Sequence, residues 1–488
     1  MKEKSTSSER ILDASGCGAW SEKSLIATAQ TRALEAHSDA LLPPHALMQR
    51  AGLAIAKFAM ALAPHAKTIW IACGPGNNGG DGYEASWHLK SWGKMPTVTC
   101  LANTNRLPPD AAISKQKALD AGVVFSDTIP THYDLCIDAL FGIGRVRPWN
   151  DSTALWINQI NSEQAPVLSV DIPSGLHADT GEAEKLHVRA HYTLSLLTLK
   201  PGLFTADGRE ACGEIWFDAL GMTNSVQACA QLNSEPVVIT RAHNTHKGSY
   251  GDVWVVGGGA GMTGAALLAA QAALYGGSGR VYVSLLDVTA IQLDISQPEL
   301  MFRAVDDVAA KTMTVVAGCG GSKVIAQHLT NLVTDSARLV LDADGLNALA
   351  LDSTLQTLLS TRPPLTTVLT PHPLEAARLM NISTSKVQAN RLEVAQTLAD
   401  RFACIVVLKG SGTVIAAPAT LPRVNISGNA RLATAGTGDV LAGLIAARLA
   451  AGGDAFARVC EAVFHHGQIA NTWSPSTPLT AQALARAL

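Results

Sequence analysis

The feature that most constrains the fold is an alternation of short β-rich runs with longer stretches rich in alanine and leucine. Repeated βα units of this kind predict parallel sheets with helical connections. The runs show little internal alternation of apolar and polar residues, as expected for strands covered by helices on both faces. The expected strands are residues 68–73, 97–101, 135–140, 167–172 and 193–197, and then 253–256, 281–283, 314–317, 339–341, 367–369, 405–408 and 414–416. The predicted fold class is therefore α/β.

The chain is too long for one hydrophobic core. At 488 residues it is expected to form two domains. The strand and helix pattern weakens into small and polar residues over 222–235, where we place the boundary. We expect a loosely held N-terminal extension over 1–24, a first domain over 25–225 and a second over 235–488. Each domain is predicted to be a three-layer α/β/α structure.

The composition excludes several classes of function. A net charge of −3 with 16% charged residues gives no electrostatic reason to bind nucleic acid or a membrane surface. The nine cysteines form no CxxC pair, so buried reduced thiols are expected rather than disulfides or a zinc site. No apolar run reaches eighteen residues, and residues 1–10 are polar rather than signal-like. We expect a cytoplasmic protein.

A first glycine-rich loop follows the expected strand at 68–73. Its sequence is Gly74-Pro75-Gly76-Asn77-Asn78-Gly79-Gly80-Asp81-Gly82. Glycine permits positive φ and close approach of the backbone to a ligand, and the asparagines and the aspartate add side-chain oxygens. The segment differs from a P-loop, because no lysine follows, and from GxGxxG, because the glycine spacing differs. The alternative is a tight strand-to-helix turn without a ligand.

Polar side chains also follow three further expected strands of the first half. Asp138, Asp171 in Val-Asp-Ile-Pro-Ser-Gly, and Lys200 stand where an open α/β sheet binds ligands. An aspartate placed after apolar strand residues is costly to bury without a partner. A cation is one such partner, because the oxygens of Asn78, Asp138 and Ser174 are of the type that hard ions prefer. Each aspartate alone is also compatible with capping a turn.

The glycine loop together with Val-Asp-Ile-Pro-Ser-Gly closely resembles the YjeF N-terminal family, the epimerase of hydrated nicotinamide nucleotides. The resemblance spans about residues 25–220 and implies a Rossmann-like domain. It implies potassium ligands at Asn78, Asp138 and Ser174, and catalytic roles for Asp171 or Lys200 in proton movement. The substrate contacts that it implies are Asn77, Asn78, Gly79, Gly80, Asp81, Gly142, Ile143, Gly144, Arg145, Val146, Arg147, Pro148 and Asp171. The sequence departs from the family after Gly82, where Tyr83-Glu84-Ala85-Ser86 replaces small aliphatic residues.

Two further segments, in the second half, have the chemistry of phosphate binding. Lys409-Gly410-Ser411-Gly412-Thr413 lies between two expected strands, so its glycines are predicted to form a hairpin whose amides, hydroxyls and lysine can hold a nucleotide. Thr434-Ala435-Gly436-Thr437-Gly438-Asp439 precedes an apolar helix, whose dipole stabilises an anionic Asp439 beside an oxyanion-type hole. The alternatives are a plain hairpin turn at Lys409 and an N-terminal cap at Asp439.

Gly-Thr-Gly-Asp at the start of a helix resembles the anion hole and catalytic base of the ribokinase-like superfamily. Asp342-Ala343-Asp344-Gly345-Leu346-Asn347 and Thr370-Pro371-His372-Pro373 resemble its NAD(P)H-hydrate dehydratase branch, from about residue 238 onward. Leu374 replaces an expected glycine. The implied substrate contacts are Ala265, Gly320, His372 and Asp439, and the implied nucleotide contacts are Lys409, Gly410, Ser411, Gly412, Thr413 and Gly438.

The two resemblances together imply a bifunctional enzyme of metabolite repair. The first domain would interconvert R and S NAD(P)HX, with K⁺. The second would dehydrate the S epimer to NAD(P)H with ADP or ATP and Mg²⁺, with Asp439 as catalytic base, releasing AMP and phosphate from ADP. The substrates would be NADHX and NADPHX, and a homo-oligomer stays open. The alternative is a ribokinase-like kinase of vitamin precursors fused to a non-catalytic nucleotide-binding module.

Overall fold

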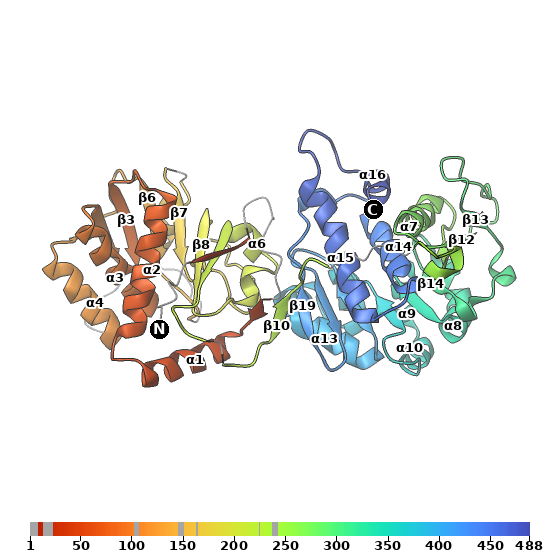
Figure 1. The fold of residues 1–488 in the computed structure, drawn as a ribbon, viewed down its shortest axis with the longest axis horizontal. Coiled ribbons are helices and arrows are strands. Elements are labelled where there is room, and N and C mark those ends of the chain that lie inside the picture. The colour runs from red at the N-terminus through yellow and green to blue at the C-terminus, as the bar shows by residue number, and fades with distance from the viewer. Residues whose placement is uncertain are drawn as a thin grey trace. The chain divides into compact units, whose positions relative to one another are not determined.

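The computed structural model describes residues 8–12, 23–101, 107–144, 151–162, 164–223, 225–236 and 243–488. The chain divides into two compact units, and the division lies between Ala230 and Gln231 (Figure 1). The division lies inside the pattern-poor segment 222–235, which nevertheless contains a strand, β10 (Ala230–Leu232).

The first unit is built on one eight-stranded sheet with the order β1-β9-β8-β7-β6-β3-β4-β5. All neighbouring strands are parallel except β1 and β9. The strands are β1 (Glu9–Leu12), β3 (Thr68–Cys73), β4 (Met95–Cys100), β5 (Val124–Ser126), β6 (Leu135–Ala139), β7 (Val167–Val170), β8 (Tyr192–Leu196) and β9 (Glu214–Asp218). A two-residue strand, β2 (Ser24–Leu25), runs beside Leu199.

Helices cover both faces of this sheet. Successive residues of a strand point to opposite faces, so one strand contributes side chains to two cores. Ile69 and Ile71 of β3 pack in one core with α2, α3 and α4, whereas Trp70 and Ala72 pack in another with α5. The helices are α1 (Thr28–Leu41), α2 (Ala46–Leu62), α3 (Asn77–Ser91), α4 (Pro109–Asp120), α5 (Asp151–Ile160) and α6 (Gly208–Ala211). Both faces are therefore buried, which explains the apolar strands.

The second unit has a larger sheet, in which strands β13-β12-β11-β14-β15-β16-β17-β18-β19-β10 follow one another. Its pairs are parallel except where β18 joins β17 and β19, so the predicted hairpin after Leu408 is confirmed. The strands other than β10 are β11 (Asp252–Gly257), β12 (Arg280–Leu285), β13 (Met301–Phe302), β14 (Thr314–Ala317), β15 (Arg338–Leu341), β16 (Thr367–Leu369), β17 (Ile405–Leu408), β18 (Val414–Ala417) and β19 (Thr420–Val424).

Two separate cores cover the faces of the second sheet. One contains Val256 and Leu341 with the helices between β14 and β17, and the other contains Val255 and Val340 with α7, α14 and α15. The helices are α7 (Thr263–Tyr275), α8 (Ala326–Asp335), α9 (Asp344–Leu351), α10 (Ser353–Ser360), α11 (Pro373–Met380), α12 (Thr384–Ala389), α13 (Arg391–Phe402), α14 (Thr437–Ala450), α15 (Ala455–Thr472) and α16 (Ala481–Arg486). The prediction of two three-layer α/β/α structures is thus confirmed.

The structure also bears on two expectations from composition. The eight cysteines within the described ranges are free, and six of them are buried. Among the helices that the structure describes, none combines the length and the apolar character needed to cross a membrane.

Candidate active sites

The predicted polar residues of the first unit gather at the carboxyl ends of β3, β6 and β7. In the sheet register, Asp138 lies between Ala72 of β3 and Ser169 of β7. Asp171 follows the last residue of β7, and α3 begins at Asn77, four residues after β3. Because the carboxyl ends of parallel strands meet at one edge, these groups share the ligand-binding edge of the sheet.

The first glycine loop is shaped by close packing. A Cβ on Gly74 would lie 1.7 Å from the carbonyl oxygen of Leu140, and one on Gly79 would lie 2.1 Å from that of Gly74. No glycine of this fully described loop has a positive φ. Gly74 and Gly79 therefore allow close backbone contact rather than unusual dihedral angles. Asn77 to Asp81 belong to the first turns of α3.

The Asn78 side chain faces the segment that follows β6. Its amide nitrogen is buried without a hydrogen-bond partner among the described residues. A Cβ on Gly142 would lie 3.0 Å from the Asn78 Oδ1 atom, so a glycine at 142 leaves this oxygen accessible. Ile143 and Gly144 follow in the same segment, whereas Arg145, Val146, Arg147 and Pro148 lie outside the described residues.

Asp138 is fully buried but surrounded by donors. Its carboxylate accepts hydrogen bonds from the Ser174 hydroxyl at 2.6 Å, the Ser174 amide at 3.0 Å, the Ser169 hydroxyl at 2.8 Å and the Leu140 amide at 3.2 Å. Burial raises the pKa of Asp138, and these hydrogen bonds oppose the rise. The structure therefore brings Asp138 and Ser174 together.

Asp171 and Lys200 form a buried ion pair. The Lys200 ammonium donates to the Asp171 carboxylate and also to the Leu196 carbonyl at 2.7 Å, and only 1% of the lysine side chain is exposed. The Leu196 amide donates to Asp171 at 3.1 Å. Asp171 has a φ of 67°, a conformation that is uncommon outside glycine and typical of strained functional turns.

Helix α1 adds residues that the motif-based reasoning missed. It is held at this edge by a 2.8 Å hydrogen bond between the hydroxyls of Thr31 and Thr198, and Arg32 donates to the Ile143 carbonyl at 3.2 Å. Burial raises the pKa of Glu35, and the charge of Asp171 adds to the rise. Burial likewise raises the pKa of Asp81 well above its usual range, with Asp171 and Glu35 adding to it. The spacing of Arg32 and Glu35, which places both on one helix face, was the available signal.

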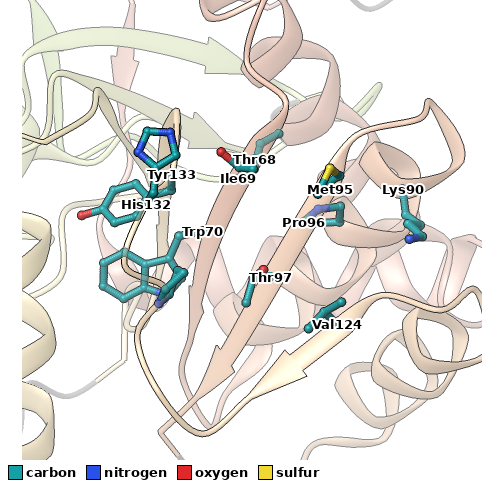
Figure 2. Close-up of a pocket in the computed structure, with 11 residues that line it drawn as sticks. Thr68, Ile69, Trp70, Lys90, Met95, Pro96, Thr97, Val124, His132 and Tyr133 are labelled. Atoms are coloured by element: carbon teal, nitrogen blue, oxygen red, sulfur yellow. The ribbon is translucent and has the colours of Figure 1, made fainter.

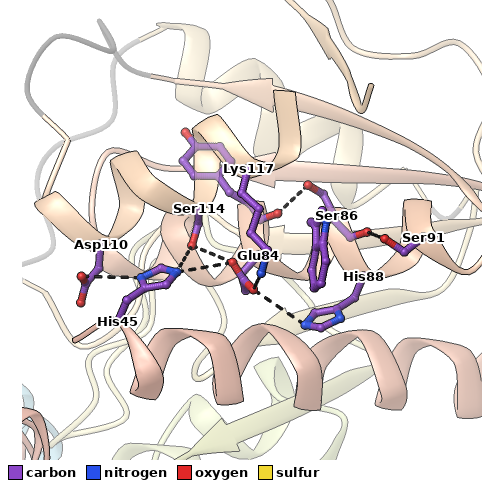
Figure 3. A network of polar contacts seen from close by, with 10 residues as sticks. His45, Glu84, Ser86, His88, Ser91, Asp110, Ser114 and Lys117 are labelled. Atoms are coloured by element: carbon purple, nitrogen blue, oxygen red, sulfur yellow. Dashed lines mark hydrogen bonds and ion pairs between the residues drawn. The ribbon is translucent and has the colours of Figure 1, made fainter. Parts of the chain in front are cut away.

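Glu84, at the departure from the family pattern, is the centre of a buried polar network (Figure 3). Its carboxylate accepts from Lys117 at 2.5 Å and from Ser114 at 3.0 Å, and His45 and His88 lie 3.6 and 3.8 Å away. The Lys117 ammonium also lies 3.4 Å from the centre of the Trp87 ring. The network connects α3 to α4 and to the start of α2, so it fixes the helix that carries Asn77 to Asp81.

A pocket of about 150 Å³ lies at the opposite edge of the first sheet (Figure 2). Thr68, Met95 and Val124, which are the first residues of β3, β4 and β5, contribute to its wall. None of the predicted site residues lines it. It is therefore separate from the edge at which Asp138 and Asp171 lie.

In the second unit, the predicted residues again lie at the carboxyl ends of parallel strands. Gly320, after β14, packs against the first turn of α7, because a Cβ on it would lie 2.9 Å from the Ala265 Cβ atom. The neighbouring Cys319 Sγ and carboxylate oxygens of Asp342 and Asp439 all lie within 4.8 Å of one another. Ala265, Gly320 and Asp439 thus belong to one site.

Lys409 forms an ion pair with Asp342 rather than with Asp439. Its ammonium lies 2.6 Å from Asp342 Oδ1, and the Asp342 side chain is 2% exposed. Asp439 stands in the first turn of α14. Burial raises the pKa of Asp439 to about 6, and the charge of Asp342 adds to the rise, whereas Lys409 opposes it. A carboxylate with this pKa is charged at neutral pH and basic enough to accept a proton.

His372 is held at the start of α11 by a capping box. Its Nδ1 accepts from the Leu374 amide at 3.1 Å, and Glu375 accepts from the His372 amide at 2.8 Å. Burial, with the charge of Lys409, lowers the pKa of His372, so the imidazole is neutral at neutral pH. The turn thus keeps its geometry with leucine at 374, the position where glycine was expected.

The loop 409–413 joins β17 to β18, and α13 supports it from behind. The Arg391 guanidinium donates to the carbonyl oxygens of Leu408, Lys409 and Gly412 at 3.1–3.3 Å. Gly410 and Gly412 have positive φ values of 127° and 64°, which favour glycine there. Arg391 is 2% exposed. No sequence motif marks this arginine.

The turn before α14 is also fixed by its neighbours. Gly436 adopts the left-handed conformation, with φ of 90°, and a Cβ there would lie 2.6 Å from Leu268. The Thr437 hydroxyl donates to the carbonyls of Leu432 and Thr434 at 2.8 and 2.9 Å. A Cβ on Gly438 would lie 3.4 Å from the Lys409 ammonium. The predicted nucleotide residues Lys409 and Gly438 therefore face each other.

Comparisons with known proteins match both units. Residues 44–202 match the family model described as YjeF-related protein N-terminus, and residues 253–488 match the one described as NAD(P)H-hydrate dehydratase. The chain is 33% identical to the bifunctional NAD(P)H-hydrate repair enzyme Nnr of Escherichia coli (strain K12), covering 87% of this chain and 84% of that protein. The protein of the same name from Thermofilum pendens is also 33% identical, with 86% of each chain covered. A solved ADP/ATP-dependent NAD(P)H-hydrate dehydratase from Bacillus subtilis is 30% identical over 51% of this chain and 91% of its own, with a TM-score of 0.42.

Proposed function

The chain belongs to the family of bifunctional NAD(P)H-hydrate repair enzymes, and from this premise we propose that its two sites act in succession on one damaged cofactor. The predicted family and the predicted pair of epimerase and dehydratase activities are confirmed by the two family models and by relatives that match most of the chain. The first unit interconverts R and S NAD(P)HX. The second dehydrates the S epimer, so neither epimer is stranded.

In the first unit, Asp171 and Lys200 are proposed to move the proton during epimerisation. Their ion pair is almost removed from water, so a proton passed between these groups and the substrate is shielded from exchange with solvent. Glu35 and Asp81, whose pKa values burial raises, keep further protons near the same edge. The substrate contacts we propose are the residues of the first turns of α3 and of the segment after β6.

Potassium is proposed to bind between Asn78, Asp138 and Ser174. All three offer oxygen atoms, which hard monovalent and divalent cations prefer. The fit is supported by the glycine at 142, because a side chain there would crowd the Asn78 oxygen. A bound cation would offset the cost of the buried Asp138 charge.

In the second unit, Asp439 is proposed to be the general base. The observation that carries this proposal is that Lys409 neutralises Asp342 and leaves Asp439 as a separate carboxylate with a pKa of about 6. Asp439 takes the proton of the C6 hydroxyl while the hydroxyl oxygen attacks the terminal phosphoryl group of ADP. The phosphoryl group is transferred to that oxygen, and AMP departs. Loss of phosphate from C6 and of a proton from the ring then restores NAD(P)H.

The nucleotide is proposed to bind along the loop 409–413 and at Gly438, with the substrate at Ala265, Gly320 and His372. Amides before α14 face the transferring phosphoryl group, where helix N-termini stabilise negative charge. Mg²⁺ would accompany the nucleotide phosphates and neutralise the charge that develops on them. Arg391, which bonds three carbonyls of the loop, supports the loop from outside the site.

The test is the recovery of NADH from an equimolar mixture of R and S NADHX, with ADP and Mg²⁺ added, followed by the absorbance of the reduced nicotinamide ring. We expect recovery of the whole mixture. Recovery of half would remove the epimerase from the proposal. No recovery, with a stable phosphorylated product formed from ATP and a vitamin precursor such as pyridoxal, would instead support a small-molecule kinase.

A further inference from the structure

Cys319 occupies a position that the backbone fixes. Its neighbours Gly318 and Gly320 have positive φ values of 112° and 57°. A Cβ on Gly318 would lie 2.1 Å from the Asp342 carbonyl oxygen, and one on Gly320 would lie 2.7 Å from that of Met262. Cys319 is therefore the side chain that this tight turn presents to the carboxylates, and it is 0% exposed.

The thiol is placed to act on Asp439. Its sulfur and the carboxylate oxygens of Asp342 and Asp439 lie within 4.8 Å of one another, which puts the thiol beside the Asp439 carboxylate. Asp342 already binds the Lys409 ammonium, which also disfavours a metal ion among these three groups. Burial raises the pKa of Cys319 well above its usual range, with the charges of Asp439 and Asp342 adding to the rise. The group therefore remains an S–H donor at neutral pH.

We propose that Cys319 is a positioning residue for the dehydration: its S–H holds the Asp439 carboxylate toward the substrate and keeps it charged. This inference rests on the proposed role of Asp439 as general base. Four groups from three segments face Asp439, of which Asp342 and Asp344 disfavour its charge and Lys409 and Cys319 favour it. Without the thiol, Lys409 is the one group of these four that still favours the charged form of Asp439.

The test compares Cys319→Ala with Cys319→Ser in ADP-dependent NADH recovery from S-NADHX, measured as kcat/KM against pH. The acid limb of Cys319→Ala should move to higher pH by about one unit, because a hydrogen bond to a charged group is being lost. Above that limb its kcat/KM should remain below that of the unchanged protein, because Asp439 is charged there but is no longer held toward the substrate. Cys319→Ser should restore the original limb, because its hydroxyl donates from the same position.

Cys404→Ala is the matched control. Cys404 is also fully buried in the second unit, and burial alone raises its pKa, so this variant should leave the limb in place. Infrared titration of the Asp439 carboxyl band, assigned by its absence in Asp439→Asn, gives a readout without turnover, and the same shift is expected there.

An unchanged limb and carboxyl titration in Cys319→Ala would overturn the inference, as would equal shifts in the Ala and Ser variants. Full dehydration by Asp439→Asn would instead overturn the proposed role of Asp439. The two failures are thereby distinguishable.

Discussion

The two sites use the same pair of residue types, a lysine and a buried aspartate, in opposite ways. In the first unit, Lys200 binds Asp171 itself, the carboxylate proposed to take part in the chemistry. In the second, Lys409 binds Asp342 and leaves the proposed base, Asp439, outside the pair. The contrast separates two uses of a lysine beside a buried carboxylate. It can be a partner in proton exchange, or it can neutralise a neighbouring carboxylate so that another one stays basic.

Asp439→Asn should break the comparison most strongly. The amide cannot accept the hydroxyl proton, so kcat/KM for dehydration of the S epimer should fall by about 10²–10⁴-fold. Exchange between R and S epimers, followed by chromatography without ADP, should continue at the original rate. Loss of both activities would contradict two separate sites.

Lys200→Met should remove epimerisation and destabilise the first unit. It leaves the Asp171 charge without its partner, which costs about 3–5 kcal/mol of unfolding free energy when a buried pair is broken. Denaturant unfolding and epimer exchange check both effects. Lys185→Met, at an exposed lysine of the same unit, is the control and should change neither. Normal epimer exchange in Lys200→Met would contradict the role of the ion pair.

Asp138→Asn tests the proposed cation site with little change of shape. Loss of the carboxylate charge should weaken activation by K⁺ and slow epimerisation, whereas dehydration of S-NADHX should be unaffected. Rates measured with increasing KCl, at ionic strength held constant with choline chloride, check this. If the rate of epimerisation by the protein without the substitution does not depend on K⁺, the cation has no part in the mechanism.

The pH dependence of dehydration sharpens the comparison further. The base must be charged, and the pKa of Asp439 is about 6, so kcat/KM should be constant above this pH and fall tenfold for each unit below it. Initial rates with pure S-NADHX, measured at pH values on both sides of this pKa, give the acid limb of the profile. A limb near the ordinary aspartate pKa would show that the environment described for Asp439 does not govern its charge.

Glu84→Gln should have the smallest effect. The amide keeps a hydrogen-bond partner for Ser114 but loses the charge that attracts Lys117, whose side chain is 29% exposed and can be hydrated instead. We expect a loss of about 1–3 kcal/mol in unfolding free energy with epimerisation retained. Glu182→Gln, at an exposed glutamate, is the control. Loss of epimerisation with unchanged stability would give Glu84 a role in the chemistry.

Much of the fold could be predicted from the sequence because buried parallel strands leave continuous apolar runs, such as Thr68–Cys73. Short edge strands such as β5 and β13 were missed, since two or three residues carry no pattern. The two glycine motifs identified the ligand-binding edge of each sheet. Glu35 and Arg391 could not be found in the same way, because each reaches its site through tertiary packing of a helix that carries no motif.

One contact of Lys409 extends beyond its side chain. The Lys409 amide donates to the Pro371 carbonyl at 2.9 Å, so the backbone that begins the proposed nucleotide loop is bonded to the residue before His372, on the proposed substrate loop. Neither loop can shift without straining the other. Ordering of one by its ligand lowers the entropy cost of ordering the second, and thermodynamic linkage makes this benefit equal in both directions. Cofactor hydrate and nucleotide should thus bind with positive cooperativity.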